Sequence, residues 1–134
     1  MAAQQKRAFP AITPANRHFW CGGADGRLHI LRCAEGHWIH PYAARCPICG
    51  SADIAPQPVS GRGTVAGFTV KHQPWLPDVE VPYVVAIVEL AERHDLRLMT
   101  NMPRTPIEEV HVGMPVKVYF EQYGEIFLPL FEAA

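Results

Sequence analysis

Four side chains of a kind that binds metal fall close together in the N-terminal half of the chain. The stretch CAEGHWIHPYAARCPIC spans 17 residues and contains Cys33, His37, Cys46 and Cys49. Structural zinc sites take four sulfur or nitrogen donors in a tetrahedron. The pair Cys46 and Cys49, followed by Gly50, is typical of a turn whose backbone amides point at both thiolates. We therefore predict one zinc ion per chain, which staples this part of the fold.

The fourth ligand is the part of this pattern that departs from a usual zinc ribbon. A usual zinc ribbon has a second Cys-x-x-Cys pair, but position 36 is Gly. The nearest competent substitute is His37, and Glu35, His40 and Cys21 are further candidates. We take His37 as the expected ligand and keep the other three as alternatives.

Other uses of the cysteines are disfavoured by their surroundings. The first twenty residues lack the apolar stretch of roughly seven or more residues that an export signal needs, so we expect a reducing, cytoplasmic location without disulfides. A thioredoxin-like role for Cys46 and Cys49 would need a helix, whereas Gly50, Pro56 and Pro58 predict a turn and a linker. No segment reaches the roughly 20 apolar residues of a membrane span.

Composition limits the fold and the partners. The chain has 134 residues and is 49% hydrophobic, enough for one ordinary core or for a small metal module joined to a barrel. Thirteen prolines in clusters exclude long helices over most of the chain.

The charges are divided unevenly along the chain. Residues 1–60 carry six Lys or Arg and three Asp or Glu, whereas residues 61–134 carry six Lys or Arg and ten Asp or Glu. The acidic second part is unsuited to a nucleic-acid backbone.

Residue order predicts a mainly β chain with a short N-terminal helix. Thr13 as the N-cap and Pro14 at the first helical position predict a helix to Trp20, which Gly22 and Gly23 would end. The expected strands are 26–33 and 38–39 in the ribbon, then 61–70, 81–90, 96–100, 114–120 and 126–131.

The last five strands, with a longer interruption at 101–112, fit a five-stranded, partly open Greek-key barrel, the OB-fold. We expect four segments along the chain. They are an N-terminal helical segment (1–25), a zinc ribbon (26–51), a linker with two prolines and no helical period (52–60), and an OB-fold domain (61–134).

The sequence offers no set of residues for independent catalysis. Cys21 lies near His18 and His29 in sequence, but we expect it to pack beside the neighbouring aromatic residues. The remaining histidines at 72, 94 and 111 are dispersed among turn signals. The glycines at 61 and 63 open a strand and lack the Lys of a phosphate-binding loop. We therefore expect a chain that is not an enzyme on its own.

Several motifs together resemble a known family over nearly the whole chain: FWCGGADGRLHILRC, HPYAARCPICGS, GRGTVAGFTV, VPYVVAIVEL and VGMPVKVYF. In that family a rubredoxin-like zinc ribbon precedes an acyl-CoA-associated OB-fold, long catalogued as a domain of unknown function. Its ribbon pattern matches Cys33, Cys46 and Cys49, whereas Gly36 and His37 stand where Cys-Gly is usual. The resemblance thus implies either a Cys-His-Cys-Cys site or a ribbon that folds without metal.

The resemblance implies an accessory subunit without catalytic residues. Such proteins are typically small subunits of thiolase-like enzymes, including sterol-carrier-type thiolases and retro-aldolases of steroid side-chain breakdown. It implies a thiolase-like partner in a heterotetramer of two plus two chains, bridged or stabilised by this chain, with acyl-CoA at the interface. Steroid or other long-chain acyl degradation is the implied context, and no nucleic acid or membrane is an implied partner.

Two residue types are candidates for contact with the partner or acyl-CoA. Guanidinium groups grip phosphates, and exposed aromatic side chains mark protein interfaces, whereas buried ones are core. The candidates are Arg17, Arg27, Arg32, Arg45, Phe19, Trp20, Trp38 and Trp75.

Two further functions remain as alternatives. A zinc ribbon with an OB-fold also occurs in proteins that bind single-stranded nucleic acid, which the acidic barrel half disfavours. An independent acyl-CoA or lipid carrier would need an enclosed apolar pocket.

Overall fold

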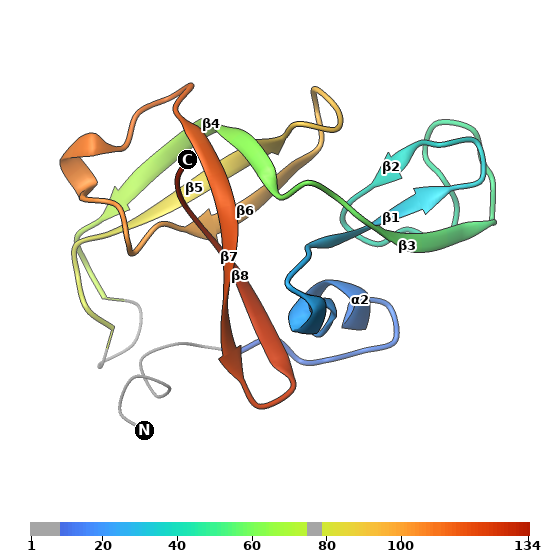
Figure 1. The fold of residues 1–134 in the computed structure, drawn as a ribbon, viewed down its shortest axis with the longest axis horizontal. Helices are drawn as coiled ribbons and strands as arrows, with labels where there is room; N and C mark the ends of the chain where they lie inside the picture. The colour runs from blue at the N-terminus through green and yellow to red at the C-terminus, as the bar shows by residue number, and fades with distance from the viewer. Residues whose placement is uncertain (1–8, 75–78) are drawn as a thin grey trace.

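The chain forms two antiparallel sheets that lie beside each other, with a short helical segment near both (Figure 1). The computed structural model describes residues 9–74 and 79–134. The ribbon sheet has the strand order β2-β1-β3, and the barrel sheet has the order β6-β5-β4-β7-β8. The predicted architecture, mainly β with a short N-terminal helix, a small ribbon and a five-stranded barrel, is confirmed.

The elements follow the chain in an order close to the predicted one. They are α2 (Arg17–Trp20), the 3-10 helix η1 (Gly22–Asp25), β1 (His29–Cys33), β2 (Trp38–Ile39), β3 (Ile54–Pro58), β4 (Arg62–Lys71), β5 (Tyr83–Leu90), β6 (Arg97–Asn101), the 3-10 helix η2 (Ile107–Glu109), β7 (Pro115–Tyr123) and β8 (Ile126–Ala133). Helices in the described part of the chain are a single turn long, so none of them could cross a membrane.

The helical segment begins later and continues further than expected. Asn16 rather than Thr13 stands before the first residue of α2. The Asn16 side-chain oxygen accepts a hydrogen bond from the Thr13 backbone amide at 2.8 Å, because Asn bonds readily to nearby backbone in turns. Gly22 and Gly23 do not end the segment. They begin η1, which ends at Gly26 with a φ of 79°.

Residues 52–60, expected to be a linker, include strand β3. This strand pairs with β1 along its whole length, from Cys33 opposite Ile54 to His29 opposite Pro58. Its two prolines are tolerated because β3 lies at the edge of the ribbon sheet, where an outward-facing backbone nitrogen needs no strand partner. The ribbon sheet therefore extends to residue 58.

The barrel bends where the sequence is rich in glycine. The register of β4 against β5 shifts between Val65 and Gly67, which is a β-bulge. A Cβ atom on Gly63 would overlap the backbone carbonyl of Glu89, so the close approach of these two strands requires glycine. The barrel is not closed by hydrogen-bonded pairing between β6 and β8. The Thr100 hydroxyl instead donates to the Pro129 carbonyl across that gap at 3.3 Å.

One apolar core continues from the ribbon into the barrel. Leu28, Ile30 and Trp38 belong to the same buried cluster as the barrel residues Val65 and Val88. A separate small cluster lies under the metal-binding residues and consists of Leu31, Cys33, Ile39 and Cys46, with Ala43 and Ile54 packed against it. The two sheets are therefore joined by shared side-chain packing as well as by the chain connection.

Gly23 lets η1 pack closely on the hairpin of β7 and β8. A Cβ atom at this position would lie 2.7 Å from the Phe120 ring and 2.8 Å from Cβ of Phe127. Both distances are shorter than van der Waals contact, so no larger residue fits without displacing the hairpin.

We predict that Gly23→Ala lowers the free energy of unfolding by about 2 kcal/mol, because the added methyl group overpacks this contact. Chemical denaturation followed by tryptophan fluorescence measures the change. Gly67→Ala is the matched control. It adds a methyl group where no other atom lies within 4 Å, and we expect a change within about 0.5 kcal/mol. Equal stability of Gly23→Ala and the wild type would contradict the packing described.

Candidate metal centre

Cys33 and His37, the first pair of metal-binding residues, flank the tight turn between β1 and β2. The Cys33 backbone amide donates to the His37 carbonyl at 3.0 Å, and the Gly36 amide donates to the Cys33 carbonyl at 2.9 Å. Gly36 has a φ of 92°, which favours glycine, so this turn suits the residue found where a Cys is usual. The His37 backbone amide also donates to Cys33 Sγ at 3.4 Å. The turn therefore holds both side chains on one side of the hairpin.

The second pair lies on a loop before β3. The Gly50 amide donates to the Cys46 carbonyl and the Cys46 amide to the Ser51 carbonyl, each at 2.8 Å. The Ile48 amide donates to Cys46 Sγ at 3.4 Å. This is the amide-to-sulfur arrangement that the Cys-x-x-Cys-Gly spacing predicts. Arg45 stabilises the loop from outside, because its guanidinium donates to the Gly50 carbonyl at 3.1 Å.

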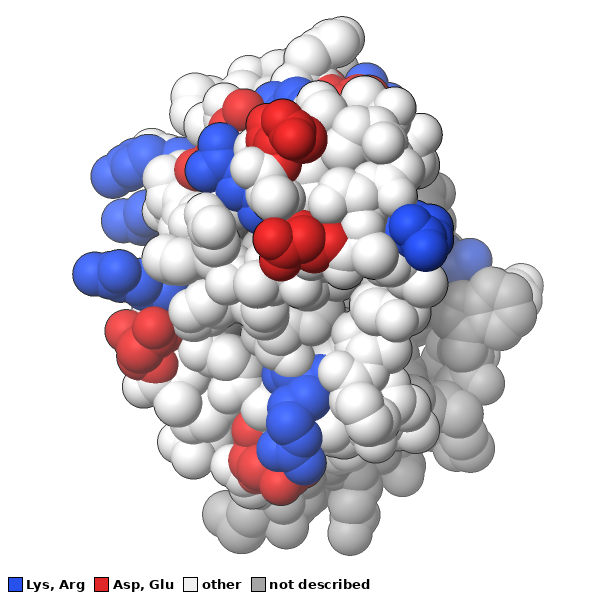
Figure 2. Space-filling view, turned by 90° about the vertical axis from the view of Figure 1, so that its right-hand side faces the viewer, with Lys and Arg blue, Asp and Glu red and all other residues white. Residues whose placement is uncertain are grey.

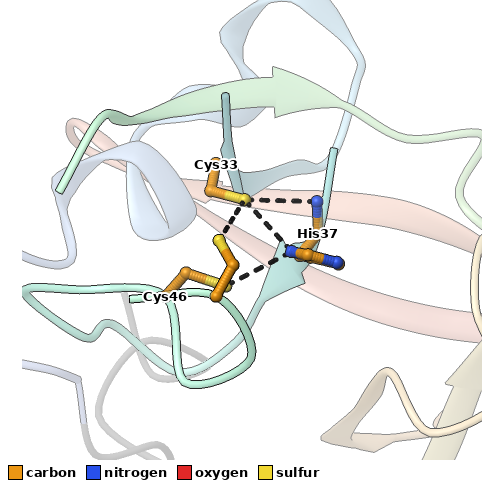
Figure 3. A group of neighbouring side chains, drawn as sticks. Cys33, His37 and Cys46 are labelled. Atoms are coloured by element: carbon orange, nitrogen blue, oxygen red, sulfur yellow. Dashed lines mark hydrogen bonds between the residues drawn. The ribbon is translucent and has the colours of Figure 1, made fainter. Parts of the chain in front are cut away.

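The two pairs converge on one point. The ligand atoms of Cys33, His37, Cys46 and Cys49 all lie within 4.8 Å of one another. Figure 3 shows the Cys33 and Cys46 sulfurs near the same ring nitrogen of His37, from which they lie 3.4 and 3.6 Å. Cys33 and Cys46 are buried, His37 is half-buried and Cys49 is exposed. The four residues can therefore hold a metal ion near the surface of the ribbon.

The distances fit zinc better than a disulfide. Zinc bonded tetrahedrally at about 2.3 Å to sulfur and about 2.0–2.1 Å to nitrogen places two sulfurs about 3.8 Å apart and sulfur and nitrogen about 3.5 Å apart. The Cys33 and Cys49 sulfurs lie 3.7 Å apart, and both sulfur–nitrogen distances fall within 0.1 Å of 3.5 Å. A disulfide needs about 2.05 Å. All four cysteines of the chain are free.

Backbone amides of the loop that carries Cys46 and Cys49 also favour the deprotonated form of Cys46. Desolvation raises the pKa of Cys46, but hydrogen bonds from the backbone amides of Cys49 and Ile48 outweigh it and lower that pKa to about 6. The Ser51 amide lowers the pKa of Cys49, yet desolvation and the neighbouring sulfurs leave it raised. Metal binding requires deprotonated sulfur, so the Cys46 thiol needs less help from the ion than the Cys49 thiol.

The alternative fourth ligands lie outside this group. Among the described residues, Glu35, His40 and Cys21 are not part of any cluster able to hold a metal. The His40 ring instead packs 4.9 Å from the Phe19 ring. Burial lowers the pKa of His40, and the nearby His18 lowers it further, which favours a neutral imidazole in this packed position.

The candidate arginines have mostly structural contacts. The Arg17 guanidinium forms an exposed ion pair with Glu125 at 3.3 Å. Arg32 lies 4.5 Å above the Trp38 ring and donates to the Gly36 carbonyl at 3.0 Å, while Arg45 braces the metal-binding loop as described above. The side chain of Arg27 is exposed.

Charge on the ribbon side of the molecule is mixed. Lys and Arg side chains gather mainly along one edge, with acidic side chains among them and an uncharged area beside them (Figure 2). Three of the four candidate arginines have separate contacts within the chain, and Arg27 is exposed.

The candidate aromatic residues divide into core and surface. Phe19 and Trp38 are buried, with 7% and 8% of their surface exposed, and both belong to the shared core. Trp20 is half-buried and lines a groove at the open side of the barrel. Trp75 lies outside the described residues. Of the aromatic candidates within the described residues, Trp20 is the one whose side chain is partly exposed.

Sequence analysis missed the residue that ties the ribbon to the barrel. Arg93 lies in the turn between β5 and β6, and its guanidinium donates to the Trp38 backbone carbonyl at 2.8 Å. Asp95 fixes the same guanidinium through an ion pair of 2.6 Å. Beside it, Glu92 accepts a hydrogen bond from the Ser60 amide at 2.8 Å. A charged turn sequence gives no sign of such a distant partner.

Known proteins that resemble this chain share both its sequence and its fold. A family model described as the C-terminal OB-fold domain of ChsH2 matches residues 56–121. A solved structure described as an Ltp2-ChsH2(DUF35) aldolase aligns with a TM-score of 0.82 and 37% identity, over 93% of this chain and 98% of that chain. This chain belongs to the DUF35 family.

Two curated relatives of this DUF35 chain are named as subunits of hydratases. A probable enoyl-CoA hydratase alpha subunit from Thermomonospora curvata is 38% identical over 96% of this chain. A 3-oxo-4,17-pregnadiene-20-carboxyl-CoA hydratase alpha subunit from Mycobacterium tuberculosis is 33% identical over 87% of this chain. The chain spans only 40% and 37% of the length of these two relatives.

We predict that the purified DUF35 chain holds about one zinc per chain and that His37→Ala weakens zinc binding about a hundredfold or more, since a direct ligand is lost. Competition with a chromogenic chelator measures the affinity. His94→Ala is the matched control, because the His94 side chain is 91% exposed and lies outside the cluster. A folded, metal-free wild type, or equal zinc affinity of His37→Ala and the control, would contradict the four-ligand site.

Proposed function

We propose that this chain is a non-catalytic accessory subunit of a thiolase-like enzyme that acts on acyl-CoA thioesters. The observation that carries the proposal is the alignment with a chain of an aldolase complex over 98% of that chain's length. The curated relatives named as alpha subunits support a role within an assembly. The chain would bridge or stabilise the catalytic chains, in a heterotetramer of two plus two.

The arrangement of the described residues supports a role without catalysis by this chain alone. Among the described residues, the lining of the groove at the open side of the barrel contains no His, Cys, Ser, Lys or Arg, and therefore no nucleophile with an adjacent base. Both threonine hydroxyls that line it are already used, one as a donor to backbone carbonyls and the other as an acceptor from the Ala133 amide. Cys33 and Cys46 lie near the His37 ring, but all three residues belong to the metal centre.

The proposed zinc ion has a structural role. When bound, it would cross-link the β1–β2 turn to the loop before β3, with Cys33, His37, Cys46 and Cys49 as its four ligands. Four protein ligands leave no open coordination position for a substrate, which is the pattern of structural rather than catalytic zinc.

The names of the relatives support a substrate class. One of them is named for a pregnadiene carboxyl-CoA, a CoA thioester on a steroid skeleton. Together with the family resemblance, this supports steroid or other long-chain acyl degradation as the context. Acyl-CoA would lie at the interface with the catalytic partner, as the family resemblance implies.

Both alternative functions are less well supported. A single-strand-binding OB module needs a basic groove with stacking aromatics, whereas the described residues that line this groove include two glutamates and no basic residue. An independent lipid carrier needs an enclosed pocket, whereas this groove is open along one side.

We predict that a tagged copy of the chain, expressed in its native host, recovers a thiolase-like protein that mass spectrometry identifies. We further expect acyl-CoA cleavage only when both purified chains are mixed, because the catalytic residues belong to the partner. Native mass spectrometry of the mixture should give a mass of two plus two chains.

The control is the same pull-down with the tag alone. Recovery of nucleic acid would favour the single-strand-binding alternative. Binding of acyl-CoA to the isolated chain, without any protein partner, would favour the carrier. Cleavage of acyl-CoA by the isolated chain would contradict the non-catalytic role.

A further inference from the structure

The four metal-binding residues differ in how far solvent can reach them. Cys33 and Cys46 are only 4% and 3% exposed. His37 is half-buried and Cys49 is exposed. The neighbouring Ile48 is 59% exposed, so the part of the loop that carries Cys49 lies at the surface. A small oxidant in solution therefore meets the sulfur of Cys49 before it meets the two buried sulfurs.

A second sulfur lies within reach of Cys49. Its Sγ atom is 3.7 Å from Sγ of Cys33, the last residue of strand β1. The sulfurs of a disulfide lie about 2.05 Å apart, so this pair is reduced, in agreement with the free state of all four cysteines. The remaining gap is smaller than the distance by which a change of rotamer moves a cysteine sulfur. Side-chain rotation with a small shift of the loop can therefore bring the two sulfurs to bonding distance.

Metal binding and oxidation use the same form of cysteine. A sulfur that binds zinc is deprotonated, and the thiolate is also the form that attacks peroxides. Cysteines that sense oxidants combine thiolate character with exposure and with a second cysteine nearby that closes a disulfide. In the zinc-loaded site Cys49 would have all three properties, with Cys33 as the second cysteine.

The structure separates this site from the rest of the fold. The ligands lie over the small cluster that contains Leu31 and Ile39, whereas the ribbon packs on the barrel through the main core. Strand β3 pairs with β1 over all of its five residues, through contacts that need no metal. Loss of the ion would therefore loosen residues 40–53, the loop between β2 and β3, without separating the ribbon from the barrel.

We propose that Cys49 and Cys33 are a peroxide-sensitive pair, whose oxidation to a disulfide releases the zinc ion and loosens the loop of residues 40–53. The inference rests on the four-ligand zinc site and is independent of the accessory role. It makes the ribbon a reversible switch, because a dithiol reduces such a disulfide by thiol–disulfide exchange and the site can then be loaded again.

The oxidation takes place in two steps and consumes one hydrogen peroxide. In the first, the Cys49 thiolate attacks a peroxide oxygen, so that an S–O bond forms, the O–O bond breaks and hydroxide leaves. In the second, the Cys33 thiolate attacks the sulfur of the resulting sulfenic acid, so that the S–S bond forms, the S–O bond breaks and a second hydroxide leaves. The two sulfurs together lose two electrons, which the two peroxide oxygens gain. His37 and Cys46 are then the remaining ligands, too few for a structural zinc site.

The first test treats the zinc-loaded full chain with hydrogen peroxide and follows the free zinc with a chromogenic chelator. We expect release of about one zinc per chain, together with the loss of two hydrogen atoms from the intact mass. Peptide mapping should find residues 33 and 49 in one disulfide. With peroxide below one equivalent and dimedone present, the sulfenic acid should be trapped on Cys49. A dithiol and added zinc should restore the original mass and zinc content.

The variant Cys49→His separates zinc binding from oxidation, because it keeps a zinc ligand at this position and removes the exposed thiolate. We expect peroxide to release its zinc about tenfold or more slowly than that of the wild type. Cys21→Ser is the matched control, since Cys21 lies outside the cluster, and its zinc release should follow the wild type within about twofold. If Cys49→His does not load with zinc, the disulfide map and the dimedone label of the wild type decide the question.

Hydrogen exchange measures the structural consequence. Oxidation should raise the exchange of backbone amides in residues 40–53 and leave strands β4–β8 as protected as in the zinc-loaded chain. Equal protection of residues 40–53 in the oxidised and the zinc-loaded chain would contradict the switch.

The outcomes distinguish the inference from the proposals beside it. A folded chain that is purified without zinc overturns the four-ligand site and the inference with it. Zinc that stays bound in peroxide, a disulfide between Cys46 and Cys49, or a dimedone label on another cysteine overturns the inference alone. The thiolase-like partner is tested by the pull-down, whose result does not depend on any of these measurements.

Discussion

The contact at Trp38 holds the ribbon against the barrel, and the relative placement of every other feature depends on it. The Trp38 side chain is buried in the core that both sheets share. The Arg32 guanidinium covers the outer face of its ring, and Arg93 of the barrel donates to its backbone carbonyl. The buried Trp38 ring supplies a large apolar area, and the charged Arg93 group strengthens the hydrogen bond to the backbone of the same residue. The two parts are thereby fixed as one unit, although they have separate sheets.

The metal centre has a more local effect. Its ligands lie over a small cluster formed by Leu31 and Ile39 with two of the cysteines, separate from the main core. Strand β1 serves both clusters, since Ile30 belongs to the main core and Leu31 to the small one. The alternation of a β-strand makes this division possible, because neighbouring side chains point to opposite faces. The metal would therefore order the loops at the far end of the ribbon, whereas the near end is held by the barrel.

Local patterns in the sequence were sufficient for much of this structure. The barrel strands are short β-branched runs bounded by turn residues, and the metal cluster follows from the spacing of Cys33, His37, Cys46 and Cys49. The sequence was misleading where one residue type has two uses. Prolines at 56 and 58 suggested a linker, yet an edge strand accepts them equally well.

Features that depend on distant segments could not be predicted. The groove at the open side of the barrel combines residues from the helix, four strands and a loop, and no spacing along the chain links Trp20 with Met99 or Tyr123. The contact between the ribbon and the barrel could not be predicted for the same reason, because Arg93 and Trp38 are 55 positions apart. The contacts of the candidate arginines were not predictable either, because stacking and backbone hydrogen bonds use guanidinium groups that the sequence suggested for phosphate binding.

The two prolines of β3 also affect how the molecule can associate. An exposed strand edge usually offers a row of amides and carbonyls to which another chain can add as a further strand. Two of the five residues of β3 have no amide hydrogen, so the ladder on this edge cannot continue. Strand-by-strand polymerisation through the ribbon is thereby blocked. An assembly that includes this chain can then stay finite, with its size set by side-chain recognition instead of by backbone pairing.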